Sequence, residues 1–219
     1  MRILSTNLGA AAVVREGRRP SGIGKRPVGA LDVADPGPKR RGPGGVGFSG
    51  VAGDFVGNGR HHGGSAQAVY AFAREELDHW ERELGRTIAP GLFGENLTTA
   101  GIDVDAAEQG DVWRVGSAVL VVTGPRVPCA TFAARMGERA WVRRFTERGR
   151  SGCYLAVREP GRVAAGDAIA VEPSGSGLVM PRLLAGWMGD LDAARESMAN
   201  PALDGESRDH FTRLLAQRA

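Results

Sequence analysis

Cysteine is scarce in this sequence, which contains only Cys129 and Cys153 among 219 residues. Two cysteines do not form the disulfide framework that stabilises small secreted domains. Long hydrophobic runs are also missing, since no stretch approaches the roughly 18 apolar residues of a membrane-spanning helix. Residues 1–14 lack the apolar core and cleavage site of a signal peptide and are expected to begin with a strand. These absences predict a cytoplasmic protein without a membrane partner, in which Cys129 stays a free thiol.

Several catalytic motifs are absent as well. The sequence has no serine nucleophile elbow, no phosphate-binding P-loop and no glycine fingerprint for dinucleotides, which argues against hydrolases, kinases and nicotinamide dehydrogenases. The adjacent His61 and His62 would point apart on an extended chain, and no Cys/His cluster has zinc-site spacing. The net charge of +3 is mild, and the basic residues are scattered without interleaved aromatics. We therefore expect no nucleic-acid partner, and an anionic small ligand accounts for the charge equally well.

The composition predicts a folded, β-rich protein. Hydrophobic residues make up 42% and charged residues 24% of the chain, as in ordinary globular domains. The 33 glycines, combined with short apolar runs, favour turn-rich β structure. Two or three strands are expected within residues 1–34, and further strands at 97–99, 112–115, 118–122, 154–157 and 168–171. This spacing suits a closed or partly closed barrel.

Two helices are expected inside this β-rich region. One long helix is predicted over residues 65–84, with Gly85 at its end. Its apolar face would consist of Val69, Phe72, Ala73, Leu77, Trp80 and Leu84. A shorter helix is predicted around residues 138–146.

The composition changes after Pro173. A flexible Ser/Gly run at 174–177 is followed by three segments of helical length, at 181–188, at 190–198 and around 211–215. We therefore predict a mostly β domain over residues 1–173 and a small three-helix module over residues 178–219. Residues 35–47, rich in Pro, Gly and Arg, are expected to form a mobile surface loop.

Cys129 is the strongest candidate for chemistry. It ends the segment Gly124-Pro125-Arg126-Val127-Pro128-Cys129, directly after an apolar run. The two prolines stiffen the backbone and predict a rigid, non-helical position for the thiol. A guanidinium near a thiol lowers its pKa, and the thiolate is the form that binds soft metals or carries sulfur. The alternative is that Cys129 is a small buried hydrophobe.

Two other segments could contact a ligand. The residues His62-Gly63-Gly64 run into the predicted helix, where backbone N–H groups and the helix dipole favour an anion; the alternative is an ordinary turn. Asn96 opens a predicted strand and offers an amide to a heterocycle, although it could equally tie down a turn. Its neighbour Glu95 would point to the opposite face of that strand.

Four segments in this order resemble the MOSC family, the molybdenum cofactor sulfurase C-terminal domain: Gly53-Asp54, His62-Gly63-Gly64, Phe93-Gly94-Glu95-Asn96-Leu97 and Pro125-Arg126-Val127-Pro128-Cys129. Further matches are Gly110-Asp111, Gly152-Cys153-Tyr154, Glu159-Pro160-Gly161 and Gly166-Asp167. The resemblance covers residues 20–172. It implies a MOSC-type β-barrel with a few helices, and the tail is similar to the three-helix module of stand-alone bacterial members.

The resemblance also implies a site. Cys129 would be the catalytic residue and would ligate molybdenum of a molybdopterin cofactor. Contacts to the cofactor are expected from Lys25, His62, Gly63, Gly64, Asn96 and Arg126. Lys25, Arg126 and the N–H groups after Gly64 would hold the pterin phosphate, while Asn96 would lie on the pterin side. The partners would be a small-molecule substrate and an electron-donor protein or a cysteine desulfurase, and binding of pyridoxal phosphate is a further expectation.

Three functions remain open at this point. The leading prediction is an oxidoreductase that reduces N-hydroxylated compounds, with chemistry supplied by the molybdenum cofactor. The second is a sulfur carrier that bears a persulfide on Cys129. The third is a non-catalytic binder of a phosphorylated cofactor or metabolite, in which Cys129 is only structural.

Overall fold

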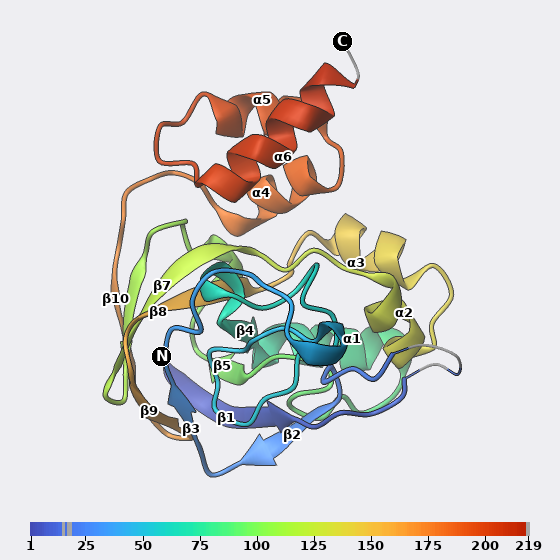
Figure 1. The fold of residues 1–219 in the computed structure, drawn as a ribbon, viewed down its shortest axis with the longest axis vertical. Coiled ribbons are helices and arrows are strands. Elements are labelled where there is room, and N and C mark those ends of the chain that lie inside the picture. The colour runs from blue at the N-terminus through green and yellow to red at the C-terminus, as the bar shows by residue number, and fades with distance from the viewer. Residues whose placement is uncertain (15, 17–18, 218–219) are drawn as a thin grey trace.

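The computed structural model describes residues 1–14, 16 and 19–217 (Figure 1). Eight strands form one sheet in the order β10-β6-β7-β8-β4-β5-β1-β2. Their bounds are β1 Arg2–Gly9, β2 Lys25–Val28, β4 Val69–Ala73, β5 Leu97–Ala100, β6 Val112–Val115, β7 Ala118–Pro125, β8 Cys153–Glu159 and β10 Ile169–Glu172. The strands β3 (Ala30–Val33) and β9 (Gly161–Ala164) pair with each other in a separate ladder.

Six α-helices accompany the strands in the described part of the chain: α1 Arg74–Leu84, α2 Ala130–Met136, α3 Trp141–Arg148, α4 Met180–Trp187, α5 Leu191–Met198 and α6 Gly205–Ala216. Single 3₁₀ turns form η1 (Pro43–Gly45), η2 (Ser65–Gln67) and η3 (Val104–Ala106). Figure 1 shows α4–α6 gathered at one end of the molecule, and α2 and α3 together at its side. The fold is therefore sheet-rich but mixed, and the prediction of a mostly β protein is only partly correct.

The sheet does not close into the predicted barrel. Among the described residues, β10 and β2 are the two ends of an open eight-stranded sheet. The sheet curves, because Arg2 bridges Ala168 and the N–H of Ile3 donates to the carbonyl of Asp167 at 2.8 Å. A closed barrel needs a staggered ladder that continues around the whole circumference. In the described residues, one bridge and three backbone hydrogen bonds join residues 1–3 to residues 166–169, and no continuous ladder connects β1 with β10.

The predicted helix over residues 65–84 is wrong in its first half. Val69–Ala73 is the strand β4, and the helix α1 begins only at Arg74. All five residues of β4 are buried, because β5 and β8 flank the strand and both its faces are covered. Such a strand is a continuous apolar run that periodicity alone cannot distinguish from a buried helix.

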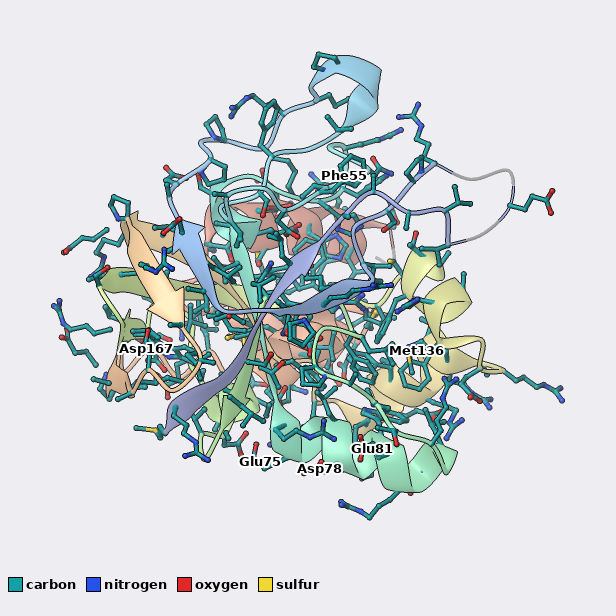
Figure 2. The ribbon with its side chains drawn as sticks, turned by 90° about the horizontal axis from the view of Figure 1, so that it is seen from below. Phe55, Glu75, Asp78, Glu81, Met136 and Asp167 are labelled. Carbon is teal, nitrogen blue, oxygen red and sulfur yellow. The ribbon has the colours of Figure 1, made fainter. Side chains whose placement is uncertain are left out.

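The helix α1 packs one face on the sheet and leaves the other in solvent. Leu77 and Trp80 are buried, whereas Glu75, Asp78 and Glu81 lie along the outer side of the helix (Figure 2). Gly85, with φ of 62°, ends the helix in the left-handed conformation.

An aromatic cluster joins α1, α2 and α3. Rings of Trp80, Phe93, Phe132, Trp141 and Phe145 contact one another with centroids 4.6 to 6.1 Å apart. The helix predicted around residues 138–146 is observed as α3. The helix α2 and the strand β9 were not predicted from the sequence. The half-buried Cys129 packs against this cluster. The aromatic rings therefore cover part of the candidate residue.

Three helices follow the Ser/Gly run at the positions that the sequence predicts. Asp190 caps α5 by accepting from the N–H of Ala193 at 2.9 Å. Met180, Leu183 and Phe211 belong to the same buried cluster as sheet residues such as Trp113. The helices therefore dock on the sheet, while the division into domains 1–173 and 178–219 stays a prediction. In the described residues, no helix combines the length and apolar character that crossing a membrane requires.

Candidate functional site

The predicted candidates meet in one cavity of about 600 Å³. Distant parts of the sequence build its wall: the segment before β2, the loop before η2, the start of β4 and the turn between β7 and α2. The predicted site residues that line it are Lys25, His62, Gly63, Asn96, Arg126 and Cys129. Tyr70, Phe93 and Tyr154 add aromatic surface. Gly64 is not among the lining residues.

Cys129 lies at the junction of a strand and a helix. It is extended, with φ of −133° and ψ of 170°, and α2 starts at the next residue. The prediction of a non-helical backbone holds for Cys129 itself, but the helix directly behind it was missed. Burial raises the pKa of the Cys129 thiol, and the His62 side chain, the Arg126 guanidinium and the N–H of Phe132 outweigh this effect and lower the pKa to about 6. At neutral pH the thiolate therefore predominates.

Arg126 is a buried cation that forms no salt bridge with a carboxylate in the described residues, and the nearby Cys129 thiol is the acidic group that its charge influences. It is 5% exposed, and its guanidinium lies 3.8 Å from the ring centroid of Phe132 and 5.8 Å from that of Tyr70. Its Nη1 is buried and finds no hydrogen-bond partner in the described residues. Burying an unpaired charge carries an effective penalty of several kcal/mol. An anionic group bound in the cavity would relieve that penalty.

Lys25 differs from Arg126, because its charge is already balanced. Its Nζ donates to both carboxylate oxygens of Asp54, and the two side chains are 7% and 3% exposed. Asp54 also accepts from the backbone N–H of Gly9 at 2.8 Å and from the Ser49 hydroxyl at 3.1 Å. Asp54 belongs to one of the segments that resemble the MOSC family, but the sequence predicts no role for it. Its partners come from distant parts of the chain, so no local pattern reveals it.

Asn96 lines the cavity with its polar atoms engaged inside the protein. Its Nδ2 donates to Asp54 at 3.1 Å and to the carbonyl of Asn7 at 3.3 Å, while its Oδ1 accepts from the N–H of Tyr70. The two amide donors are thus used, and Asn96 braces the cavity wall. Its neighbour Glu95 is buried and accepts from the N–H groups of Gly91 and Phe93.

The segment His62-Gly63-Gly64 does not precede an α-helix. It leads into the single turn η2 and then into β4, so the predicted helix dipole is absent there. The N–H groups of Gly64, Ser65 and Gln67 all donate to backbone carbonyls. The predicted α-helix is therefore wrong here, while the contact of this segment with an anion stays a prediction. His62 neighbours Cys129 and helps to lower the pKa of its thiol.

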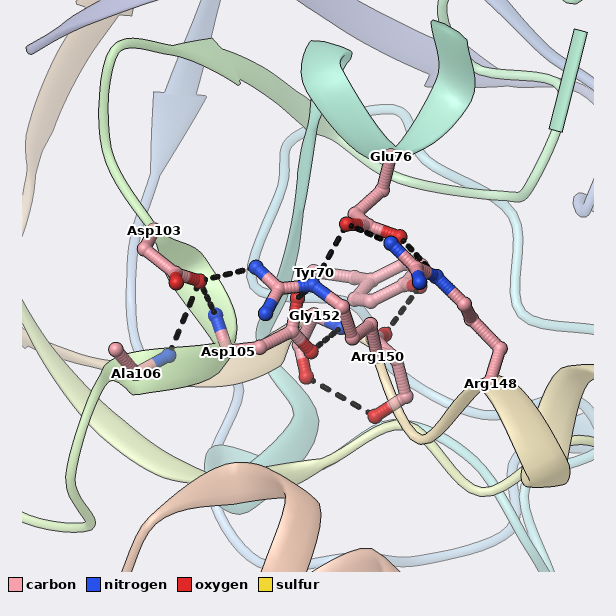
Figure 3. Close-up of polar contacts among 9 residues, drawn as sticks. Tyr70, Glu76, Asp103, Asp105, Ala106, Arg148, Arg150 and Gly152 are labelled. Atoms are coloured by element: carbon pink, nitrogen blue, oxygen red, sulfur yellow. Dashed lines mark hydrogen bonds and ion pairs between the residues drawn. The ribbon is translucent and has the colours of Figure 1, made fainter. Parts of the chain in front are cut away.

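A polar network supports the cavity wall from behind (Figure 3). The hydroxyl of Tyr70 donates to the carbonyl of Ser151 at 2.7 Å, and the N–H of Gly152 donates to Asp105 at 2.9 Å. Arg150 connects Asp105 to Glu76. Burial raises the pKa of Asp105 to about 6. This network fixes the turn before β8, and with it the Tyr70 and Tyr154 rings, whose centroids are 5.3 Å apart.

The fold and the cavity define a sheet-rich protein in which an acidic thiol and a guanidinium without a carboxylate partner in the described residues line one cavity. The family model of the MOSC domain matches residues 58–170, and the chain belongs to the MOSC domain family. This finding confirms the resemblance deduced from the sequence.

Relatives agree with this assignment. The uncharacterized protein YflK of Bacillus subtilis (strain 168) is 38% identical over 117 residues, which cover 52% of this chain and 53% of YflK. Protein YiiM of Escherichia coli (strain K12) is 32% identical over 120 residues, 53% of each chain. The aligned part thus spans about half the length of these relatives. A Gibberella moniliformis (strain M3125 / FGSC 7600) protein named Reductase is 29% identical over 116 residues, 50% of this chain and 20% of that protein.

Solved structures share the whole fold. The crystal structure of YiiM from Geobacillus stearothermophilus superposes with a TM-score of 0.73 at 26% identity and covers 98% of both chains. YiiM from Escherichia coli gives a TM-score of 0.70 at 22% identity, over 99% of this chain and 94% of that one. The helices α4–α6 are therefore part of a shared architecture.

The residues present fit a molybdenum–pterin group. A thiolate is a soft ligand of the kind that such metals accept, and Cys129 supplies one in the cavity. The buried Nη1 of Arg126, which lacks a partner in the described chain, supplies a donor for an anion. Within the described ranges, no group of three or more His, Cys, Asp or Glu side chains could hold a metal by itself.

Proposed function

We propose that this protein is a molybdenum-cofactor-dependent oxidoreductase that reduces N-hydroxylated compounds. The observation that carries the proposal is the Cys129 thiol, whose pKa of about 6 is set in the same cavity as Arg126, whose buried Nη1 has no hydrogen-bond partner in the described residues. Membership of the MOSC family supports an association with the molybdenum cofactor. The fungal relative named Reductase supports the reaction class.

Different side chains of the cavity would bind different parts of the cofactor or substrate. Cys129 would hold the metal through its thiolate, and Arg126 would hold an anionic group of the cofactor or substrate. The bound cofactor would supply two-electron oxygen-atom chemistry, while the protein sets ligation and access. The partly exposed Tyr154 would offer flat apolar surface to a ring, with the buried Tyr70 and Phe93 packed behind that part of the wall. Asn96 and Asp54 would keep this wall in place.

The first experiment measures molybdenum and pterin in protein expressed in a host that makes the cofactor. We expect near-stoichiometric metal in wild type and its loss in Cys129→Ser. Cys153→Ala is the matched control, because Cys153 is fully buried in β8 and does not line the cavity. Wild-type protein would then be assayed for reduction of benzamidoxime with reduced methyl viologen. Protein that binds neither metal nor pterin, or loaded protein that reduces no N-hydroxylated compound, contradicts the proposal.

The low pKa of Cys129 also favours a second candidate, a sulfur carrier with a Cys129 persulfide. Incubation with a cysteine desulfurase and a sulfur source, followed by mass spectrometry, would then add one sulfur atom at Cys129. Equal labelling of Cys129→Ser rejects this candidate. Unchanged ligand content in Cys129→Ser would instead indicate a non-catalytic binder.

A further inference from the structure

Lysine is rare in this chain, and one of the two lysines lines the cavity. Of the 28 Lys and Arg residues, only Lys25 and Lys39 are lysines. A guanidinium stays protonated in proteins, whereas an ammonium group can release its proton when it is buried. Lys39 pairs with Glu206 on the surface at 2.7 Å, but the Lys25 side chain is only 7% exposed. Lys25 is therefore the one lysine among the described residues that line the cavity, and its ammonium is of a type that can give up a proton.

Asp54 holds the Lys25 ammonium in a fixed position and leaves one of its three N–H groups without an acceptor in the described residues. Asp54 accepts two of its N–H bonds, and no other acceptor for Nζ is found in the described residues. Asp54 is itself fixed by Gly9, Ser49 and Asn96. The third N–H of Lys25 is consequently available to a ligand in the cavity that Lys25 lines.

Burial and the neighbouring carboxylates shift the pKa of Lys25 in opposite directions. Burial lowers the pKa of Lys25, while Asp54 and the more distant Glu95 act to raise it, and the net direction is downward. The other charged or titratable groups that line the cavity are Arg19, His62, Tyr70, Arg126, Cys129 and Tyr154. The Lys25–Asp54 pair carries no net charge with which to attract a phosphate, whereas Arg126 carries a positive charge. This distinction separates Lys25 from the phosphate contact that the family resemblance implies.

We propose that Lys25 is the proton donor of the reaction, and that Asp54 is the positioning residue that holds its ammonium group. This inference rests on the proposed function. Reduction of R–NHOH to R–NH₂ and water consumes two electrons and two protons. The electrons come from an external donor such as reduced methyl viologen. As the N–O bond breaks, Lys25 transfers one proton to the departing oxygen, and solvent supplies the second proton and later reprotonates Lys25.

The first test titrates the amine directly and needs no activity. In full-length protein labelled with ¹³Cε-lysine, NMR should show two lysine signals, and Lys39→Arg assigns them. We expect Lys25 to titrate below the ordinary value of 10.5, and Asp54→Asn to lower it further by about one unit, because burial then acts without the counter-charge. A Lys25 signal that titrates at or above 10.5 overturns the proposal.

The second test separates a proton donor from a phosphate contact. Lys25→Arg keeps the positive charge but cannot release a proton at ordinary pH. We expect kcat to fall about 100-fold or more, as for removal of a general acid, with molybdenum and pterin content unchanged. Lys39→Arg, the same substitution at the surface lysine, should keep wild-type kcat.

Four outcomes are decisive. Lys25→Arg with wild-type kcat overturns the proton-donor role, and loss of cofactor content in Lys25→Arg shows a binding contact instead. If Lys25→Arg does not fold, the pH dependence of kcat in Asp54→Asn replaces that test. The proposal predicts that the alkaline limb of this profile moves to lower pH than in wild type. An alkaline limb at the wild-type pH overturns the proposal. Absence of activity in wild type and in Lys39→Arg together rejects the proposed function itself, whatever Lys25 does.

Discussion

The two cysteines show how position decides the chemistry of one residue type. Cys153 is fully buried in β8, and burial raises the pKa of its thiol well above the ordinary value. Cys129 is half-buried next to His62 and Arg126, which lower its pKa to about 6. We therefore expect Cys153 to be an inert core residue and Cys129 to be the reactive thiol.

This contrast predicts the pH dependence of alkylation in the cofactor-free protein. Reaction of Cys129 with iodoacetamide, followed by mass spectrometry, should be half-maximal near pH 6. Arg126→Gln should raise this midpoint by about one unit, because the thiolate loses a neighbouring cation. The exposed Arg139, which does not line the cavity, provides the control Arg139→Gln. A wild-type midpoint near 9 would contradict the prediction.

At the scale of elements, the turn before β8 is secured by a buried carboxylate. Asp105 in η3 accepts from the N–H of Gly152, and its Oδ2 is buried without a hydrogen-bond partner in the described chain. Gly152 needs its glycine, because φ is +67° and a Cβ would lie 2.3 Å from the carbonyl oxygen of Ala71. The turn, η3 and α1 are thus connected through Asp105, Arg150 and Glu76 (Figure 3).

The raised pKa of Asp105 makes stability depend on pH. Because its pKa rises from 3.8 to about 6 on folding, the folded state binds the proton more tightly than the unfolded state. The resulting stabilisation is complete below pH 3.8 and is lost as pH rises through 6, by about 3 kcal/mol at most. Asp105→Asn keeps an acceptor for Gly152 and should flatten this part of the pH profile.

Urea unfolding between pH 4 and 7 measures this effect. The difference in the free energy of unfolding between wild type and Asp105→Asn should change across that range. Asp103→Asn is the matched control, since Asp103 is an exposed carboxylate that also pairs with Arg150. A constant difference between wild type and Asp105→Asn would show that Asp105 does not titrate in this window.

At the scale of the whole molecule, the terminal helices and the sheet share one hydrophobic core. Phe211 of α6 and Leu183 of α4 lie in the same buried cluster as Trp113 and Leu120 of the sheet. The Gln109 side chain adds a polar link by donating to the carbonyl of Thr123 and to the carboxylate of Asp204. Cooperative unfolding of the two parts follows from this shared core.

Phe211→Ala tests that cooperativity. Removing this fully buried ring should destabilise the protein by about 3–5 kcal/mol. Hydrogen exchange followed by mass spectrometry should show faster exchange in β7 as well as in α4–α6. Loss of protection confined to the helices would instead support the two separate domains that the sequence suggests.

Local patterns predicted much of the fold and part of the site. The strands from β5 to β8, the terminal helices and Cys129 follow from alternation, turn residues and the Pro-Arg-Val-Pro-Cys segment, all of which act over a few residues. The strand β4 was mistaken for helix, because a strand covered on both faces carries no alternation. Asp54 was missed as a functional residue, because its partners Gly9, Lys25 and Asn96 come from remote segments.

The sequence by itself determined the MOSC family, the short strands and the residue types that can carry the chemistry. Only the tertiary structure decided which of these residues meet, because packing brings segments before β2, before η2 and after β7 to one cavity. It also decided their electrostatic surroundings. Burial and neighbours leave Nη1 of Arg126 without a hydrogen-bond partner in the described residues, balance Lys25 with Asp54 and make Cys129 acidic. Desolvation and through-space charge depend on distance in space, which a linear pattern does not contain.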